Sequence, residues 1–398
     1  MTQPLIETAV PTETTSSRRY QIILISAAVA LYWSSMYLYV PTLPVYAENV
    51  IGDLGLVGSV LGMYGLWQAV VRLPLGIAAD WLGRRKPFIL LGFVLAGAGA
   101  ALMANATGYT GLAVGRAITG LAAAAWVPLT VLFSSLFPPK EAVRATALLS
   151  LINSLSRVIS TGVTGSLNNL GGYGLAFYLA VGVAVLAVLV TLPVREPARA
   201  PKRPSPRSIG ILVTRRDVLF PALLSAVGQY ISWATTFGFL PILAKNLGAS
   251  GEVNSLLVSL NLAVGMAGNL LISAFVKRTG SMPLLYGSYV IMAIGVVAAA
   301  TANSLAVVFL AQILIGLGGG ISYPLCMGLS IQHVDEAERA TAMGLHQAVY
   351  AIGMFAGPWL SGILADSIQI QPMFAVTAAG TFVLSMILAR MLQGQERA

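Results

Sequence analysis

The chain has 398 residues, of which 57% are hydrophobic and only 9% are Asp, Glu, Lys or Arg. A soluble globular domain carries about 25% charged residues, and no single core absorbs this much apolar surface, so lipid must be the solvent. One cysteine and two histidines argue against a disulfide scaffold and a histidine-rich metal site. The formal charge of +9 is not arranged as the basic, aromatic-interleaved stripe that is typical of nucleic-acid binding.

The N-terminal segment is polar and precedes a long apolar run. Residues 1–19 are rich in Thr, Ser and Glu, which predicts a disordered tail. The apolar run that follows could be a secretory signal, since residues 28–30 (AVA) imitate a cleavage site. Hydrophobicity continues to about residue 45, however, which is too long for a signal peptide and predicts a retained first membrane helix.

Charge clusters and Gly, Pro or Asn positions divide the rest of the chain into further apolar runs that are long enough to cross a bilayer. With the first run they make twelve: 20–45, 57–79, 87–105, 110–133, 145–167, 174–193, 218–243, 254–275, 283–302, 305–329, 341–364 and 372–390. The runs are continuously apolar and about twice as long as a barrel strand, so helices are the spanning solution. The sequence therefore predicts an all-α membrane protein with twelve transmembrane helices.

The basic residues orient these spans. Most of the 23 Lys and Arg residues fall in loops on the side of the N-terminus, which places both termini in the cytoplasm and the protein in the cytoplasmic (inner) membrane. The proline-rich stretch 194–217 is the one long polar break, and we interpret it as a cytoplasmic linker. It separates a six-helix half at 20–193 from a second half at 218–391, which a short cytoplasmic tail at 392–398 follows.

The two halves resemble each other in sequence. Residues 44–49 (PVYAEN) match 241–246 (PILAKN), and residues 141–147 (EAVRATA) match 336–342 (EAERATA). Two pseudo-symmetric halves that repeat in parallel normally enclose a site near the middle of the membrane. The repeat thus indicates a transporter with a central cavity.

A glycine-rich and basic loop, residues 76–86 (GIAADWLGRRK), joins the second and third spans. Gly76 and Gly83 allow close contact and a tight turn, Asp80 can lie at a helix N-terminus, and Arg84 and Arg85 can hold the loop at anionic headgroups. A lone basic loop could reflect topology alone. The spacing G-x-x-x-D-x-x-G-R-R, in a chain with twelve spans and a repeat, resembles the signature loop of the major facilitator superfamily.

This resemblance, over about residues 20–391, implies a secondary active transporter that works by alternating access. In that family the signature loop acts as a conformational latch, which would consist here of Gly76, Asp80, Gly83, Arg84 and Arg85. Residues 353–362 (GMFAGPWLSG) resemble an element of the family's bacterial drug and metabolite exporters, although in those exporters it belongs to the fifth span and here it lies in the eleventh. The resemblance implies export of a small amphiphilic compound or metabolite, with proton antiport as one option.

Three arginines, Arg72, Arg116 and Arg157, lie within apolar spans. Each costs roughly 2.5 to 3.5 kcal/mol at mid-membrane and must face water, protein or ligand, and Arg116 could equally be a structural tie. Every acidic residue falls in a tail, a loop or the end of a span, so no carboxylate is available there to neutralise them. The pattern supports an alternative function, an organic-anion uniporter or symporter with an arginine-lined cavity.

The other candidate substrate-binding residues are aromatic and amide side chains within the spans. Any single one of them more often packs against its neighbours, but buried amides are costly in a membrane without partners. The candidates are Tyr37, Asn153, Trp126, Gln229, Trp233, Asn261, Gln312, Tyr323, Gln347 and Tyr350. Together with the arginines, they predict an amphiphilic substrate.

Proton coupling usually employs a buried carboxylate, and the spans contain none at mid-membrane. His346, inside the eleventh span, and Glu48, at the end of the first, are the titratable candidates. A lone helix histidine is more often a packing residue, and Glu48 is more often a solvated span end. Otherwise the substrate itself carries the proton, or transport is uncoupled.

The remaining functional classes find little support in the sequence. No Ser/His/Asp set or carboxylate pair indicates an enzyme, and we expect no cofactor and no metal. A non-transporting receptor or scaffold would need a soluble signalling domain or a long tail, and the sequence shows neither. The expected partners are a small-molecule substrate, protons and the lipid bilayer, with the chain acting as a monomer and without nucleic acid.

Overall fold

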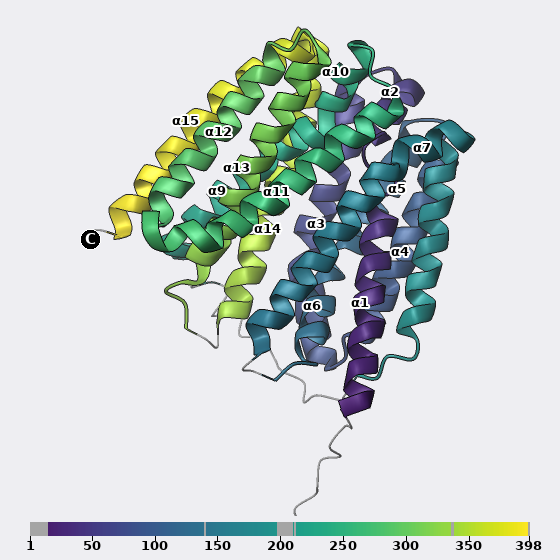
Figure 1. The fold of residues 1–398 in the computed structure, drawn as a ribbon, viewed down its shortest axis with the longest axis vertical. Helices are drawn as coiled ribbons and strands as arrows, with labels where there is room; N and C mark the ends of the chain where they lie inside the picture. The colour runs from purple at the N-terminus through teal and green to yellow at the C-terminus, as the bar shows by residue number, and fades with distance from the viewer. Residues whose placement is uncertain (1–14, 139–140, 197–209, 211, 336–337, 397–398) are drawn as a thin grey trace, which may run out of the picture.

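Figure 1 shows a computed structural model of the chain, which describes residues 15–138, 141–196, 210, 212–335 and 338–396. Every regular element among these residues is helical, which confirms the prediction of an all-α fold. The first half contains α1 (Thr15–Tyr37), α2 (Leu43–Ile51), α3 (Leu54–Leu82), α4 (Lys86–Ala104), α5 (Tyr109–Ala123), α6 (Trp126–Ser134) and α7 (Ala142–Thr191). The second contains α9 (Arg216–Ala234), η2 (Thr235–Phe239), α10 (Leu240–Asn246), α11 (Gly251–Thr279), α12 (Ser281–Ala300), α13 (Leu305–Ile331), α14 (Arg339–Ile368) and α15 (Ile370–Glu396).

Within the described residues, eleven helices are long and apolar enough to cross a membrane. One of them covers two predicted spans, because α7 is 50 residues long and its backbone leaves the helical conformation at Gly171 and Gly172. Gly172 has φ +68°, a left-handed conformation that glycine adopts at little cost. Figure 1 shows α7 turning back on itself there, so its two arms correspond to the predicted spans 145–167 and 174–193.

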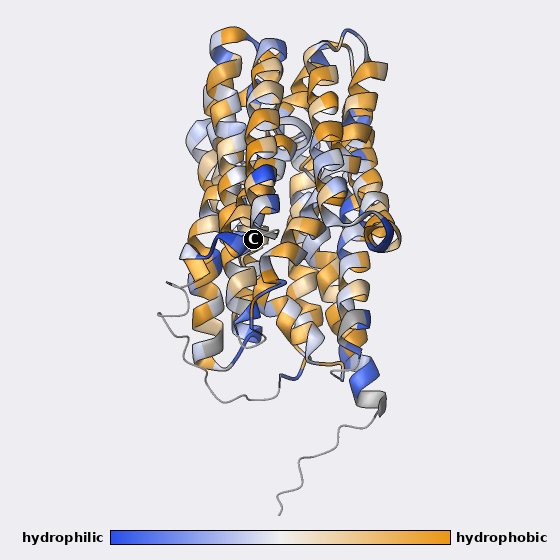
Figure 2. Cartoon of the chain, turned by 90° about the vertical axis from the view of Figure 1, so that its left-hand side faces the viewer, coloured by the Kyte–Doolittle hydropathy of each residue, from blue (hydrophilic) through white to orange (hydrophobic). Residues whose placement is uncertain are grey.

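The outer surface of the bundle is apolar. Large side chains such as Leu170, Leu270 and Ile159 are 80%, 67% and 64% exposed. Figure 2 shows hydrophobic residues along most of the length of the helices. Exposure of this kind is stable only in lipid, as the composition predicts.

The first and seventh spans are interrupted at corresponding positions, the first by a turn at residues 38–42 and the seventh by the π-helical turn η2. Pro44 lies in the first turn of the short helix α2, and Pro241 lies in the first turn of α10. Proline suits this position, because the missing N–H would have no partner within the helix. Figure 1 places α2 and α10 together at the end of the bundle opposite the start of α1.

At this α2/α10 end the two halves touch through glycines. A Cβ atom added to Gly58 of α3 would lie 2.8 Å from the Cα atom of Gly362 in α14. A Cβ atom on Gly165 of α7 would collide with the backbone of Glu252 in α11. Because real Cβ contacts are not this short, glycine is what allows the helices to approach so closely.

The ends of the predicted segments differ from the observed helices. The predicted tail 1–19 overlaps α1, which begins at Thr15, and the predicted tail 392–398 overlaps α15, which continues to Glu396. An apolar count stops at the edge of the bilayer, whereas a helix continues for another turn or two in water. Of the predicted linker 194–217, residues 197–209 and 211 lie outside the described residues, as do 1–14 and 397–398.

Candidate substrate cavity

A cavity of about 300 Å³ lies between the two halves. The first half contributes side chains from α1, α3, α6 and α7, and the second from α9, η2, α11, α13 and α14. The predicted binding residues that line it are Arg72, Arg157, Tyr37, Asn153, Trp126, Gln229, Trp233, Asn261, Tyr323 and Tyr350. Residues from spans far apart in the sequence are thus brought to one place.

Arg157 projects from α7 and is held by two aromatic rings of α1. Its guanidinium carbon lies 4.3 Å from the ring centroid of Tyr37 and 5.7 Å from that of Trp33. Cation–π contacts of this kind contribute about 0.5 to 2 kcal/mol. The side chain is half-buried, and its Nε atom has no hydrogen-bond partner among the described residues. The rings therefore orient the charge without neutralising it.

Arg72 joins the two halves across the cavity. It is 3% exposed, and its Nη1 atom donates a hydrogen bond to the hydroxyl of Tyr350 in α14. The guanidinium carbon also lies 5.5 Å from the centroid of the same ring. As with Arg157, its Nε atom is buried without a partner in the described part of the chain.

Aromatic rings of the two halves also meet directly at the cavity. Tyr64 of α3 stacks on Trp233 of α9, with centroids 5.0 Å apart and an angle of 17° between the planes. Tyr37 of α1 meets Phe237 of η2 edge to face at 6.2 Å. These contacts place apolar faces beside the two charges.

Arg116 does not line the cavity, which differs from the prediction that it binds substrate. It is 2% exposed, and its guanidinium carbon lies 4.4 Å from the ring centroid of Tyr64 and 5.6 Å from that of Trp233. Both of these rings line the cavity. The contacts favour the alternative of a structural tie, because the rings occupy the position that a substrate would need.

Gln312 and Gln347 are also absent from the cavity lining. Gln312 is fully buried, where its Oε1 atom accepts a hydrogen bond from Thr236 Oγ1 at 2.8 Å. Its backbone oxygen accepts one from the Nδ2 atom of Asn261 at 2.9 Å, so Gln312 fastens α13 to η2 through its side chain and to α11 through its backbone. Gln347 is half-buried in α14.

His346 lies in a buried polar cluster behind the cavity wall. Its Nδ1 atom is 2.7 Å from Ser330 Oγ, and its Nε2 atom is 3.0 Å from Ser225 Oγ. Ser330 donates its hydrogen to the backbone oxygen of Val218 at 3.2 Å, so the Ser330 oxygen accepts from Nδ1–H. Nε2 is then the acceptor for the Ser225 hydroxyl. Because Ser225 lines the cavity, one hydroxyl separates the imidazole from it.

Glu48 is engaged at the α2/α10 end. Its Oε2 atom lies 3.0 Å from Lys245 Nζ, and Lys245 also donates to Asn49 Oδ1 at 2.9 Å. These contacts join α2 of one half to α10 of the other. Glu48 is therefore placed to stabilise the closed end rather than to line the cavity.

In the predicted latch, Gly83 is the glycine that the backbone requires. It ends α3 with φ +63°, whereas a Cβ atom on Gly76 would make an ordinary contact with Val127 at 3.8 Å. Arg84 is exposed and Arg85 is half-buried. Asp80 belongs to the last turns of α3, and its side chain lies outside the described residues.

Glu196, which was not among the predicted functional residues, is hydrogen-bonded to this loop. Its Oε1 atom accepts from the backbone N–H of Arg85 at 2.7 Å, and its Oε2 atom accepts from that of Lys86 at 2.8 Å. A carboxylate at this position satisfies free N–H groups and the dipole at the N-terminus of α4. Lys86 Nζ in turn donates to the backbone oxygens of Leu192 and Val194 at 2.6 and 2.8 Å. The sequence did contain a signal for Glu196, because it is an acidic residue near the start of a basic linker.

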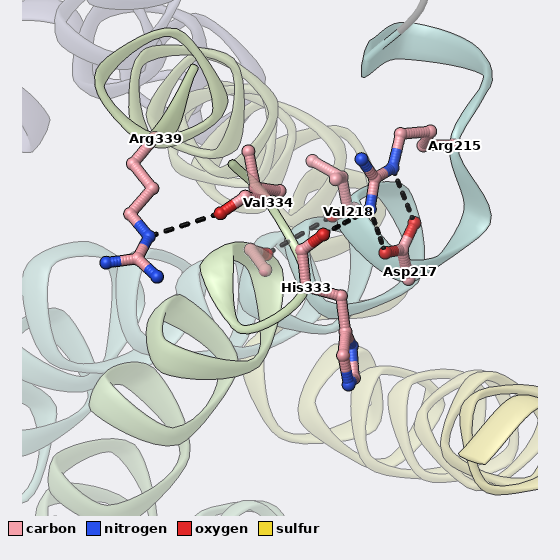
Figure 3. A network of polar contacts seen from close by, with 7 residues as sticks. Arg215, Asp217, Val218, His333, Val334 and Arg339 are labelled. Carbon is pink, nitrogen blue, oxygen red and sulfur yellow. Dashed lines mark hydrogen bonds and ion pairs between the residues drawn. The ribbon is translucent and has the colours of Figure 1, made fainter. Parts of the chain in front are cut away.

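A second polar cluster fastens the corresponding end of the second half (Figure 3). Arg215 Nη2 lies 2.6 Å from Asp217 Oδ2 and donates to the backbone oxygen of His333 at 2.8 Å. Arg339 Nε donates to the backbone oxygen of Val334 at 3.2 Å. The bond to His333 ties the start of α9 to the segment between α13 and α14, and the bond of Arg339 ties the start of α14 to the same segment.

A membrane-embedded bundle of two helical halves around a polar and aromatic cavity is the architecture of a carrier that moves small molecules. The family model of the Major Facilitator Superfamily matches residues 25–230 and 222–397, and the chain belongs to this superfamily. It is a multi-pass secondary transporter and not an enzyme, and the family that the sequence resembles is confirmed.

Individual relatives are distant but cover most of the chain. The chain is 27% identical over 391 residues to the transcription regulatory protein OpdE of Pseudomonas aeruginosa, covering 95% of both. It is 26% identical over 339 residues to the multidrug resistance protein MdtH of Aeromonas hydrophila, covering 84% of this chain and 85% of that one. The crystal structure of a bacterial homolog to the human lysosomal transporter Spinster has the same fold, with a TM-score of 0.78, 14% identity, and 96% and 98% coverage.

Proposed function

We propose that this transporter exports a small amphiphilic compound or metabolite across the cytoplasmic membrane by alternating access. The observation that carries the proposal is the cavity between the halves, which combines aromatic faces, amides and two arginines. Apolar walls with a few convergent polar groups are typical of sites for small molecules. We propose that the chain transports as a monomer.

The packing between the halves supports a state that is closed at one end. At the α2/α10 end, Gly58 and Gly165 bring the halves together backbone to backbone. Toward the other end, a Cβ atom on Gly344 of α14 would make only an ordinary contact, 3.6 Å from a side-chain carbon of Leu73 in α3. We infer that the cavity in this state is reached from the side on which the chain begins.

The orientation of the chain and the similarity to an exporter support the proposed direction of transport. The positive-inside distribution of Lys and Arg places the N-terminus in the cytoplasm, so the cavity loads from the cytoplasm. Loading from this side is the step that begins export. The similarity to MdtH, a multidrug resistance protein, favours the same direction.

Of the two candidates for proton exchange, His346 is the better placed. It reaches the cavity through the Ser225 hydroxyl, whereas Glu48 is paired with Lys245 at the closed end. A proton on His346 would compete with the hydrogen bond that Ser225 donates, which links protonation to the cavity wall. We propose that any exchanged proton is carried by His346.

Flux measurements on purified protein in liposomes test this function. The experiment uses a panel of radiolabelled amphiphiles of different charge and a pH-sensitive dye trapped inside. We expect concentrative movement of at least one compound, together with a proton movement that the His346→Gln variant loses. Absence of flux for the whole panel in protein that still binds a compound would contradict the proposal.

A further inference from the structure

The geometry points to a hydroxylated aromatic carboxylate as the ligand of the cavity, with its carboxylate on Arg157 and Arg72. This inference rests on the proposed function, because it names the class of substrate for the same site. It follows from the charge of the lining, from the unpartnered Nε atom of each guanidinium group, and from two unpartnered amide oxygens among the described residues.

The charge of the lining is the first argument. Among the described residues that surround the cavity, two are arginines and none is Asp, Glu, His or Lys. A buried charge without a counter-ion is costly, and rings offset only part of that cost. An anionic ligand would supply the missing counter-charge, whereas a cation would add to the repulsion.

The guanidinium groups are oriented to donate. Two aromatic rings lie against the guanidinium group of Arg157, and its buried Nε has no partner in the described part of the chain. Arg72 is fixed by Tyr350 and also retains an unpartnered Nε. A planar fork of N–H groups matches a carboxylate, which accepts two parallel hydrogen bonds.

The body of the ligand follows from the rest of the lining. Trp126 and Phe237 line the cavity and lie against Trp33 and Tyr37, the two rings that contact Arg157. A volume of about 300 Å³ has room for a substituted ring. The side-chain oxygens of Gln68 and Asn153 are buried without a hydrogen-bond partner among the described residues. Both residues line the cavity, and acceptors left open in this way require a donor. A ring hydroxyl is the donor that such a ligand would bring.

Three compounds that share a hydroxylated aromatic ring test which ligand charge the cavity prefers. They are 4-hydroxybenzoate, 4-hydroxybenzamide and 4-hydroxybenzylamine, which carry an anionic, a neutral and a cationic group on the same ring. Binding to the purified full chain in detergent is measured by calorimetry and by quenching of the cavity tryptophans. We expect the acid to bind at least about 10-fold more tightly than the amide, and the amine to bind more weakly than both.

Variants assign this preference to the arginine. Arg157→Gln should reduce the ratio between acid and amide to below about 3-fold, and measurable binding of the amide shows that the variant is folded. Arg157→Lys keeps the charge but lacks the fork, so its ratio should be intermediate. Arg390→Gln removes an exposed arginine of α15 and should behave as wild type.

Benzoate tests the hydroxyl. It lacks the donor for Gln68 and Asn153, so it should bind about 5-fold more weakly than 4-hydroxybenzoate, and Gln68→Leu should reduce this difference. Equal binding of the two acids would overturn the assignment of the ring hydroxyl.

The outcomes separate this inference from the proposed function. Equal affinity of wild type for acid and amide, an unchanged ratio in Arg157→Gln, or no binding of the acid would each overturn the assignment of an anionic ligand. Flux of a neutral or cationic compound in liposomes would leave the transporter function intact in that case. Binding of the acid without flux of any compound would instead contradict the proposed function and support the site.

Discussion

At the scale of single residues, the arginines within the spans contact aromatic rings rather than carboxylates. Arg157 lies on Tyr37 and Trp33, Arg116 lies on Tyr64, and Arg72 is bonded to Tyr350. Rings hold a cation in place without removing its positive charge. The cavity therefore keeps an attraction for anions that an Asp or Glu partner would cancel.

The ring of Tyr37 should be necessary for this effect, and its hydroxyl should not. Tyr37→Leu removes the face on which Arg157 lies, so we expect the affinity for 4-hydroxybenzoate to fall about 5-fold or more, a loss of about 1 kcal/mol. Tyr37→Phe keeps the face and should retain the affinity. Calorimetry on the purified variants measures both. Equal losses in the two variants would show that the hydroxyl, not the ring, matters.

His346 should contribute to stability as well as to transport. His346→Leu leaves the hydroxyls of Ser225 and Ser330 without their ring partner, so the free energy of unfolding should fall by about 1 to 3 kcal/mol. His333→Leu, at an exposed position, is the matched control and should change little. Thermal denaturation in detergent compares them. A similar Tm for the two variants would mean that the buried cluster adds no stability.

The sequence predicted which types of side chain form the site better than it predicted which individual residues line the cavity. Arg72 and Arg157 line the cavity, but Arg116, which has the same side chain in an equally apolar span, is covered by Tyr64 and Trp233. Whether an arginine lines the cavity depends on the rotation of its helix and on the packing of other spans, and the residues next to it in the sequence determine neither. Phe237 was missed because a Phe in an apolar run is an ordinary residue.

At the scale of elements, glycine positions determine how closely helices of opposite halves approach. Gly58 of α3 packs on Gly362 of α14, and Gly165 of α7 packs on the start of α11. Helices without side chains at the contact can slide and separate at low cost. Such contacts suit an interface that must open and close in each transport cycle.

A side chain at Gly58 should hold the α2/α10 end open. Its Cβ atom would meet the backbone of Pro358 and Gly362, neither of which can move aside alone. We expect Gly58→Leu to abolish flux in liposomes while retaining binding of 4-hydroxybenzoate. Gly287→Leu is the control, since nothing lies within 4 Å of a Cβ atom at that α12 position. Normal flux in Gly58→Leu would contradict a role of this contact in closure.

Element boundaries were predicted where composition changes and missed where it does not. The break at Gly171 and Gly172 falls between two predicted spans because paired glycines interrupt an apolar run. The π-helical turn Thr235–Phe239 was not predicted, since residues 235–239 (TTFGF) are compatible with a regular helix. Packing against other elements decides the conformation of such a segment.

At the scale of the whole molecule, hydrophobic run length was sufficient to predict the fold class, because only helices satisfy the backbone in lipid. The positive cavity adds an energetic consequence. If the ligand is a monoanion, a membrane potential negative inside drives its export by about 2.3 kcal/mol per 100 mV. An anion exporter of this kind has a driving force even without a buried carboxylate for proton coupling.

The most direct test of the account is the accessibility of the cavity from the two sides of the membrane. Ser154 lines the cavity, and the native Cys326 is 0% exposed. Ser154→Cys therefore places one accessible thiol in the cavity, while the native thiol stays out of reach of a reagent. A membrane-impermeant thiol reagent is applied to intact cells and to inside-out vesicles, with and without the additional change Gly58→Leu. We predict labelling from the cytoplasmic side alone in Ser154→Cys and labelling from the external side when Gly58→Leu is added. Labelling from neither side, or from both sides equally in the two proteins, would contradict a cavity that opens to one side at a time.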